Sequence, residues 1–228
     1  MNQDKIWDYY QNNSDYDSFG GSLPRYRYLA KQVGPGQKVL NIGVGRGGLE
    51  KLLIEKKVEV SSLDPSEVSI EKLRNLGMGD SARVGYSQNI CFADHTFDVV
   101  IMSEVLEHLD DESLRETLKE VKRVLRVGGS FIGTVPAREN LVDNEAVCPG
   151  CGERFHRWGH VQTFSPQSLT QLFLKHDYKI VLTKVTSFPD WRRPGLVNFA
   201  KSFFRWILGV VGQQVAVPSI YFNVTRDY

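Results

Sequence analysis

The sequence predicts an α/β fold: a Rossmann-like, seven-stranded, mostly parallel sheet with an antiparallel last strand and helices on both faces. Three observations support this prediction. Short apolar segments rich in β-branched residues alternate with segments of helical period, a glycine-rich turn follows the first of them, and polar residues recur where the segments end. Parallel strands joined by helices need right-handed crossovers, which produce an open sheet.

The composition is that of an ordinary globular chain. Its 228 residues are 41% hydrophobic and 24% charged, which suits one domain with additions. The net charge of +1 gives no overall field that attracts nucleic acid, which argues against a nucleic-acid substrate. The sequence shows no secretory signal and no apolar run long enough to span a membrane, and its three cysteines do not make a disulfide framework. We therefore expect a cytoplasmic protein.

Residues 1–36 are expected to form an N-terminal helical cap ahead of a main domain at 37–228. The apolar side chains of Ile6, Trp7 and Tyr10 indicate one short helix, and residues 24–33 indicate a second after a Gly/Ser/Asp-rich stretch. Such helices either cover a cofactor site or pack against an edge of the sheet, and the sequence leaves both interpretations open.

The stretch at 39–50 is the part of the chain around which the rest is arranged. Residues 39–42 predict a buried strand, the glycines at 43, 45, 47 and 48 predict a tight turn, and a helix follows. Residues 58–63 predict the next strand, with Asp64 at its carboxyl end. There a carboxylate can accept both hydroxyls of a ribose, while the glycine turn lets a polar ligand approach the backbone.

A dinucleotide enzyme has to be considered at this point. Gly43-x-Gly45-x-x-Gly48 matches the dinucleotide fingerprint, and Asp64 lies twenty-one positions after Gly43. The match alone is a weak signal, so a nicotinamide or flavin cofactor and a purely structural glycine turn stay as alternatives.

The remaining elements follow in the same alternation: a helix at 66–76, strands at 82–86 and 97–102, a helix from 104 to the glycine pair at 128–129, and strands at 130–135, 178–186 and 220–225, the last of them antiparallel. Ligands of open parallel sheets lie beyond the carboxyl ends of the strands. Because several polar stretches are at those ends, we expect one cleft to collect them.

Four pieces of the chain resemble class I S-adenosylmethionine-dependent methyltransferases of the small-molecule type, in particular the ubiquinone-biosynthesis-like subgroup. VLNIGVGRGGLE (39–50) is similar to their glycine-rich first motif, and VSSLDPS (60–66) to the second strand with its ribose-binding acid. NICFADHTFDVVIMSEVLEHL (89–109) and LKEVKRVLRVGGSFIGTVP (118–136) are similar to the region from the adenine loop to the fifth strand. In this order the pieces are far more specific than the dinucleotide fingerprint.

The resemblance implies S-adenosyl-L-methionine as cofactor and assigns its contacts. The residues implied in cofactor binding are Asn41, Gly43, Val44, Gly45, Asp64, Pro65, Ser87, Gln88, Asn89 and Ser103. Two positions depart from the family pattern: Asn41 replaces an acid that helps to hold the methionine end, and Tyr86 replaces an acid of the adenine loop. Because losing two carboxylates weakens recognition of a cation, a fold that binds without catalysis stays as an alternative.

Glu104 and His108 are the predicted catalytic residues. Both are expected in the cleft near the sulfonium, where a base is needed only if the acceptor is a poorly acidic hydroxyl. The spacing Glu-x-x-Glu-His is also similar to a divalent-metal site of ubiquinone O-methyltransferases, which would make Glu104, Glu107 and His108 ligands. A solvent-exposed pair without a role is the third interpretation.

The segment 137–165 is too long for an ordinary connection and is interpreted as an insertion. Its Cys148, Cys151, His156 and His160 are of the types that tetrahedral zinc prefers, so the sequence predicts a compact zinc knuckle that stiffens a substrate lid. The alternatives are a metal-free or redox-active turn whose histidines contact the acceptor, and an inert surface loop.

Residues 190–212 are interpreted as an added amphipathic helix with bulky apolar side chains and four basic residues. It is expected to pack on its own domain or in a homodimer, or to contact a membrane or lipid-linked substrate. The sequence as a whole predicts a methyltransferase for a small-molecule acceptor: O-methylation of a sugar, a glycolipid precursor or a quinone-like metabolite. An RNA methyltransferase and a non-catalytic binding fold are the alternatives.

Overall fold

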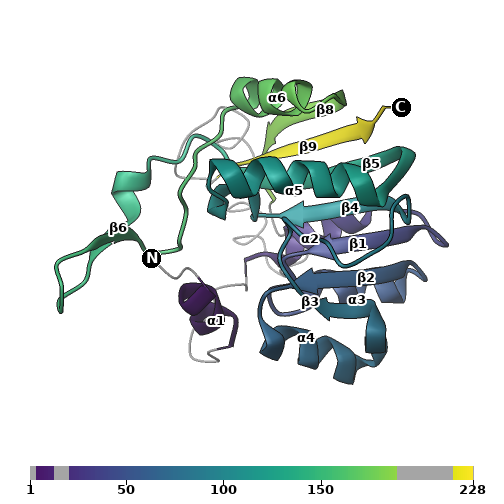
Figure 1. Ribbon diagram of the computed structural model, residues 1–228, viewed down its shortest axis with the longest axis horizontal. Helices are drawn as coiled ribbons and strands as arrows, with labels where there is room; N and C mark the ends of the chain where they lie inside the picture. Colours follow the sequence, from purple (N-terminus) through teal and green to yellow (C-terminus); the bar gives the residue numbers. More distant parts are fainter. Residues whose placement is uncertain (1–3, 13–20, 189–217, 228) are drawn as a thin grey trace, which may run out of the picture.

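A computed structural model of the chain describes residues 4–12, 21–188 and 218–227, and is a three-layer α/β structure around one central sheet (Figure 1). The seven strands of this sheet are β1 (Lys38–Ile42), β2 (Glu59–Asp64), β3 (Ala82–Val84), β4 (Phe97–Ser103), β5 (Leu125–Pro136), β8 (Tyr178–Thr186) and β9 (Ser219–Arg226). The seven-stranded sheet predicted from the sequence is therefore confirmed.

The strand order is β3-β2-β1-β4-β5-β9-β8. Strands β1 to β5 pair in parallel, while β9 is antiparallel to both β5 and β8. The chain leaves β1 for β2 on one side and returns to β4 on the other, which makes the carboxyl ends of β1 and β4 the switch point of the sheet. Open α/β sheets bind ligands at such a point.

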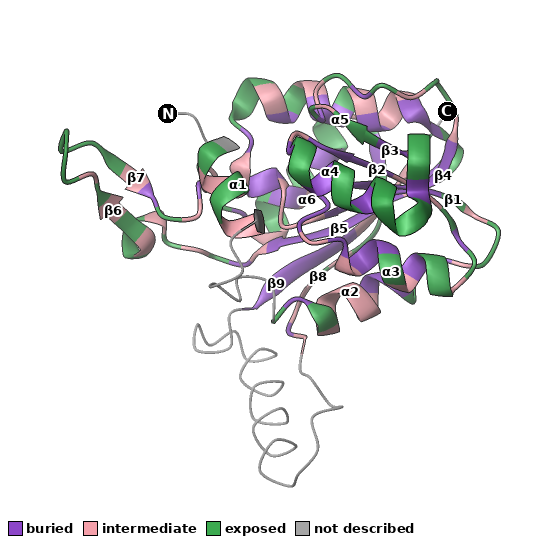
Figure 2. Ribbon diagram, turned by 90° about the horizontal axis from the view of Figure 1, so that it is seen from below, coloured by how far each residue is buried: buried purple, intermediate pink, exposed green. Residues whose placement is uncertain are grey.

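Helices cover both faces, as the alternating apolar residues of the strands require. In β4, Val99 and Ile101 belong to the core beneath α2 (Leu23–Ala30) and α3 (Gly48–Glu55), whereas Val100 and Met102 belong to the core beneath α5 (Asp111–Val124) and α6 (Pro166–Lys175). The inner strands β1, β4, β5 and β9 are mostly buried, the edge strands β3 and β8 are partly exposed, and the helices expose their outer sides (Figure 2).

Three elements have boundaries that differ clearly from those expected from the sequence. The helix after Asp64 divides into α4 (Glu67–Leu73) and a π-turn (Arg74–Met78), because Gly77 has a φ of 96°. The segment after β4 begins with a short 3-10 turn, η3 (Leu106–His108), before Asp110 caps α5. β5 starts at Leu125, five residues earlier than expected.

The insertion after β5 leaves the body of the domain. It contains η4 (Leu141–Asn144) and a hairpin of β6 (Glu145–Val147) and β7 (Arg154–His156), which projects to one side in Figure 1. Helix α1 (Asp4–Asn12) lies next to the base of this insertion. A further 3-10 turn, η2 (Gly79–Ser81), precedes β3. The predicted addition at 190–212 falls outside the described residues.

Within the described residues, no helix has the length and apolar character needed to cross a bilayer.

Candidate functional site

One cavity of about 1120 Å³ opens at the carboxyl ends of the strands, between the sheet, α1 and the insertion. Ten of the residues singled out in the sequence contribute to its wall: Gly43, Gly45, Asp64, Pro65, Ser87, Gln88, Ser103, Glu104, His108 and His160. The residues at the ends of β1, β2 and β4 therefore meet in one cleft, as the strand-end argument predicted, and His160 of the insertion joins them.

The glycine turn after β1 is shaped by close contacts. Gly43 has a φ of 84°, and a side chain there would put its Cβ 2.5 Å from Cγ2 of Val105. Gly45, with a φ of 54°, also lies in the left-handed region. Only glycine combines this conformation with so little space, so the main chain itself forms the cavity wall.

Asp64 is buried and oriented by two backbone donors. Oδ2 accepts from the Val44 N–H at 2.8 Å, and Oδ1 accepts from the Ser66 N–H at 2.8 Å. Burial raises the pKa of Asp64 to about 6, against the opposing effect of these hydrogen bonds. Each oxygen keeps a second lone pair, so the carboxylate can still accept hydroxyls from the cavity. Val44 thus supports the site through its N–H, while its side chain is in the core.

Asn41 lies beneath the glycine turn and does not contribute to the cavity wall. Its Nδ2 donates to Oε1 of Glu50 at 2.6 Å, and Ser62 Oγ donates to the same oxygen at 3.0 Å. Glu50 is fully buried, and this burial raises its pKa to about 7. An acid at position 41 would place two carboxylates in contact, which gives a physical reason for the asparagine in place of the family's acid.

The stretch expected to hold an adenine is only partly in the cavity. Ser87 is buried and its Oγ is 2.7 Å from Oγ1 of Thr117, while Gln88 Nε2 donates to Ser113 Oγ at 3.4 Å. Asn89 is exposed and does not contribute to the cavity wall. Gly85 and Tyr86 contribute instead.

Arg25 is a cavity residue that the sequence analysis did not single out. It projects from α2 to the end of β4, where its Nε donates to Ser103 Oγ at 2.9 Å and its Nη1 is 3.9 Å from Glu104 Oε1. Glu104 has a φ of 58°, an unusual value for a residue with a side chain. The guanidinium thus hydrogen-bonds Ser103 and lies at ion-pair distance from Glu104, and sequence alone offers only the weak signal of an arginine on an N-terminal helix.

Aromatic rings close the end of the cavity beside the insertion. Trp7 packs edge-on against His108 with ring centroids 5.2 Å apart, and Tyr10 packs against Trp158 at 4.7 Å. Helix α1 therefore covers the cavity instead of packing only at the sheet edge. Helix α2 packs on the sheet through Leu29 and Ala30 and contributes Arg25 and Tyr26 to the cavity wall.

His108 lies in the cavity wall in its neutral form. Burial lowers the pKa of its imidazole to about 3, and His160 and His156 lower it further. Nδ1 is 3.2 Å from the Trp7 Nε1 donor and 3.2 Å from the Gly159 carbonyl oxygen. A neutral imidazole with such a low pKa is a weak proton acceptor, which disfavours the predicted role as a base.

The predicted zinc quartet does not assemble in this structure. Cys148 and Cys151 are in the turn at the tip of the hairpin, where the Cys148 carbonyl accepts from Gly152 N at 2.8 Å. His156 pairs with Glu145 at the base of the hairpin, beyond two further residue pairs. The two histidines instead converge on Glu139: His160 Nδ1 is 2.5 Å from Oε2, and His156 Nε2 is 3.5 Å from Oε1.

Cys148, Cys151, His156 and His160 are therefore not brought together as the quartet that the sequence predicted. The register of β6 and β7 is the cause, because it keeps the base of the hairpin apart from its tip. Backbone N–H groups of Cys151 and Gly150 lower the pKa of the Cys148 thiol, and both cysteines are free.

A family profile described as "Methyltransferase domain" matches residues 22–183. Among curated relatives, a sarcosine/dimethylglycine N-methyltransferase of Halorhodospira halochloris is 32% identical over 127 residues, which are 53% of this chain and 45% of the relative. A ubiquinone/menaquinone biosynthesis C-methyltransferase of Desulfotalea psychrophila is 32% identical over 50% of this chain and 48% of its own.

A human relative named as a probable tRNA methyltransferase 9B is 28% identical over 61% of this chain and 30% of the relative. The chain thus spans less than half the length of each of these curated relatives. Among solved structures, a methyltransferase in complex with the Trm112 activator of Haloferax volcanii superposes with a TM-score of 0.71 at 18% identity, over 98% of both chains. This likeness concerns the fold.

Proposed function

The chain belongs to the class I S-adenosylmethionine-dependent methyltransferases, and on that premise we propose that it methylates a hydroxyl of a small molecule bound at the aromatic end of the cleft. A sugar, a glycolipid precursor and a quinone-like metabolite are the proposed acceptor classes. One observation supports this proposal above all: a single cavity runs from the glycine turn and Asp64 to the aromatic and histidine side chains beside the insertion.

The first half of the cavity suits the cofactor. The main chain at Gly43 and Gly45 offers backbone polar groups, and Asp64 keeps lone pairs for two ribose hydroxyls. Ser87 and Gln88 also contribute to the cavity wall, and they follow Asp64 in the chain at the positions where the resemblance implies contacts with the adenine. The bound cofactor supplies a methyl group on a sulfonium, and the residues of the chain have to bring the acceptor oxygen into line with it.

The second half of the cavity suits a small polar acceptor with an apolar face. The rings of Trp7, Tyr10 and Trp158 offer flat apolar surfaces, and Glu104 and Glu139 offer hydrogen-bond acceptors next to them. Sugars and phenolic rings combine these properties, since they carry hydroxyls on a compact apolar body. The contact of α1 with the insertion limits the size of the acceptor.

Glu104 is the side chain that we propose to orient the acceptor hydroxyl. It stands at the end of β4 beside Ser103, and Arg25 restrains its carboxylate. Such restraint lowers the entropy lost when the hydroxyl is aligned for an in-line displacement. His108 contributes to the wall of the same cavity region, and its role in catalysis remains a prediction.

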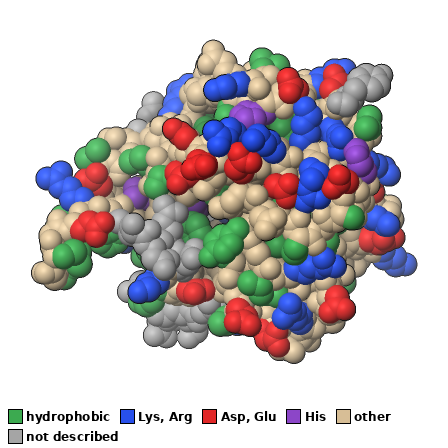
Figure 3. All heavy atoms as spheres, viewed as in Figure 1, with side chains coloured by type: hydrophobic (Ala, Val, Ile, Leu, Met, Phe, Trp, Pro, Cys, Tyr) green, Lys and Arg blue, Asp and Glu red, His purple; other side chains and the backbone are tan. Residues whose placement is uncertain are grey.

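RNA is the second acceptor class to be tested, because one relative is named as a probable tRNA methyltransferase. Against RNA, the net charge is only +1, and on the face shown in Figure 3 basic and acidic side chains are interspersed. Proteins that bind RNA backbones usually present a continuous basic surface.

Transfer of a tritiated methyl group from S-adenosylmethionine tests the proposal. The purified chain is incubated with sugars, a lipid extract, quinol precursors or total tRNA, and each product is isolated. We expect labelled small molecules, with at least a tenfold lower rate for Glu104→Gln and little change for Glu116→Gln on the exposed side of α5. Label found only in tRNA, or in no acceptor although S-adenosylhomocysteine binds, would overturn the proposed acceptor class.

A further inference from the structure

A buried carboxylate without a hydrogen-bond partner lies next to His108 in the η3 turn, and of these two residues only His108 contributes to the cavity wall. The Glu107 side chain is 1% exposed, and neither of its oxygens has a hydrogen-bond partner among the described residues. Its main-chain carbonyl accepts the N–H groups of Val161 and Gln162 of the insertion at 2.8 and 3.1 Å. Burying such a group is costly unless something compensates its charge.

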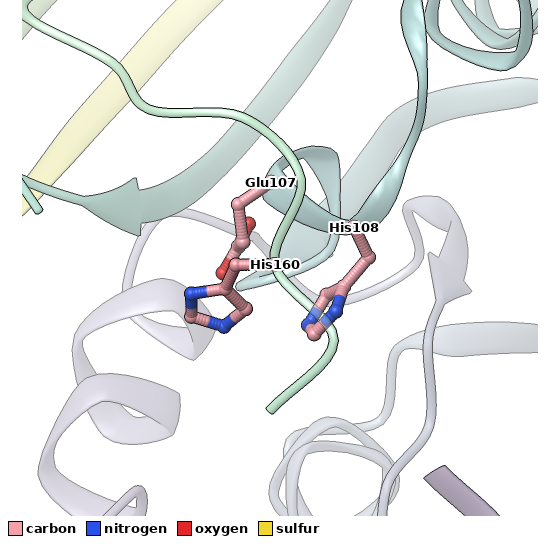
Figure 4. Close-up of side chains that lie close together, drawn as sticks. All are labelled: Glu107, His108 and His160. Atoms are coloured by element: carbon pink, nitrogen blue, oxygen red, sulfur yellow. The ribbon is translucent and has the colours of Figure 1, made fainter. Parts of the chain in front are cut away.

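Two imidazoles lie beside this carboxylate. One ligand atom each of Glu107, His108 and His160 fall within 4.8 Å of one another. Figure 4 shows the three side chains close together, with Glu107 and His108 on the η3 turn and His160 on the loop that follows β7. The two imidazole rings meet edge-on with centroids 4.7 Å apart. A carboxylate and two imidazoles are a common ligand set for divalent transition metals.

The hydrogen bonds of the imidazoles determine which ring nitrogens remain available. His160 Nδ1 is 2.5 Å from Glu139 Oε2, so a proton on Nδ1 is held there and Nε2 keeps its lone pair. His108 Nδ1 is 3.2 Å from both the Gly159 carbonyl oxygen and the Trp7 Nε1–H donor; in the tautomer that donates Nδ1–H to Gly159, Nε2 is free for a cation. A carboxylate or carbonyl behind a ligating histidine is the usual arrangement in metal sites, because it fixes the tautomer and the ring orientation.

A second group, Glu139, His156 and His160, also lies within 4.8 Å. Its hydrogen bonds argue against a cation. His156 Nδ1 accepts the backbone N–H of His160 at 3.1 Å, so the proton of the neutral ring is on Nε2, which faces Glu139 Oε1. Glu139 is hydrogen-bonded to His160 Nδ1 and lies near the Nε2–H of His156, so this group serves as support for His160.

Glu104 is not part of the ligand group, although the spacing Glu-x-x-Glu-His had suggested it. Its carboxylate is engaged by Arg25 at 3.9 Å, and the chain changes from strand to 3-10 turn between positions 104 and 107. A single helical face carrying all three residues does not form. The insertion supplies His160 in its place.

We propose that Glu107, His108 and His160 bind one divalent transition-metal cation of the zinc class, with Glu139 orienting His160. Three protein ligands leave a coordination position open, as in catalytic zinc sites. His108 and His160 contribute to the cavity wall, so this position is on the acceptor side of the cleft.

The proposed role of the cation rests on the function proposed above. The cation coordinates the acceptor oxygen and lowers the pKa of its hydroxyl, which releases its proton to solvent. An oxygen lone pair then forms the O–CH3 bond, while the C–S bond breaks and its electron pair stays on sulfur. The metal is neither oxidised nor reduced.

Metal titration of the full chain tests the site without any acceptor. The Cys148→Ser/Cys151→Ser variant is stripped with a chelator and titrated with Zn²⁺, so that the hairpin cysteines do not contribute. We expect one equivalent to bind, with affinity reduced at least tenfold by His160→Ala, about tenfold to a hundredfold by Glu139→Gln, and not by His176→Ala, which is remote from the cleft. Substituting Co²⁺ should give an absorption spectrum without a thiolate charge-transfer band.

Binding of S-adenosylhomocysteine by each variant verifies that it is folded. Absence of a stoichiometric site in the cysteine-free variant, or equal affinity in the His160→Ala variant, would overturn the proposal. If the site binds zinc but the chain methylates an acceptor other than a hydroxyl, the metal site is supported and only the proposed function is refuted.

Discussion

The buried Glu50 carboxyl makes the stability of this protein depend on pH in a way that one substitution should remove. Its pKa is raised from 4.5 to about 7, first of all by burial. In the unfolded chain the group ionises at its ordinary pKa. Between pH 4.5 and 7 the folded state therefore binds more protons than the unfolded state, and the free energy of unfolding falls as pH rises.

The magnitude follows from this difference. About 2.5 pKa units correspond to roughly 3 kcal/mol, all of it lost above pH 8 and none of it below the unfolded pKa. Glu50→Gln keeps an acceptor for Asn41 and Ser62 but cannot ionise. Relative to the wild type, this variant should gain roughly 3 kcal/mol of stability between pH 4 and pH 8.

Urea unfolding of both proteins at half-unit steps from pH 4 to 8 measures this difference, in which the other titrating groups cancel. The exposed Glu55 on the same helix provides the control, since Glu55→Gln should change the free energy of unfolding by less than about 0.5 kcal/mol. If the difference in free energy of unfolding between wild type and Glu50→Gln does not change with pH, the raised pKa assigned to the buried Glu50 carboxyl is refuted.

Three other predictions concern the cofactor side of the cleft. Asn41→Asp should lose about 2 kcal/mol at pH 8 because two carboxylates would touch, and adding Glu50→Gln should restore the loss, both measured by urea unfolding. Gly43→Ala should weaken S-adenosylhomocysteine binding about tenfold or more in calorimetry, because its Cβ meets a valine side chain and its φ is positive. Asp64→Asn should weaken the same binding about tenfold to a hundredfold, and wild-type affinity should fall below pH 6 as Asp64 takes up a proton.

Matched controls separate these effects from general damage. Gly150→Ala has an ordinary φ, and its Cβ would lie 3.9 Å from the nearest atom, so cofactor binding should be unchanged. Asn41→Asp combined with Glu50→Gln that stays as unstable as the single variant would contradict the repulsion argument. Equal affinity at pH 5 and pH 7.5 would contradict the role of an ionised Asp64.

The sheet could be predicted from the sequence because its signals are local. Buried parallel strands are continuous apolar runs, and the turn after β1 requires glycine for steric reasons that hold wherever this turn occurs. The cavity positions of Asp64, Ser103 and Glu104 and the antiparallel β9 followed from the same strand pattern. The predicted boundaries of helices and strands were less accurate where one residue has an unusual backbone conformation, such as the positive φ of Gly77.

The parts that could not be predicted depend on contacts between distant segments. Arg25 meets Ser103 seventy-eight residues away, and nothing local to either residue indicates that pairing. The zinc quartet failed because the register of β6 and β7 decides whether the cysteines and histidines meet. The asparagine at position 41 is explained by its hydrogen bond to Glu50 on the next helix, and the sequence around position 41 does not indicate this contact.

The central claim is that the bare main chain after β1 and the carboxylate after β2 bind an adenosyl sulfonium together. A calorimetric titration of the wild-type chain with S-adenosylhomocysteine, and in parallel with NADH, tests it most directly. We expect one saturable site for S-adenosylhomocysteine and no heat of binding with NADH. Saturable binding of NADH, or no heat with S-adenosylhomocysteine, would contradict the account.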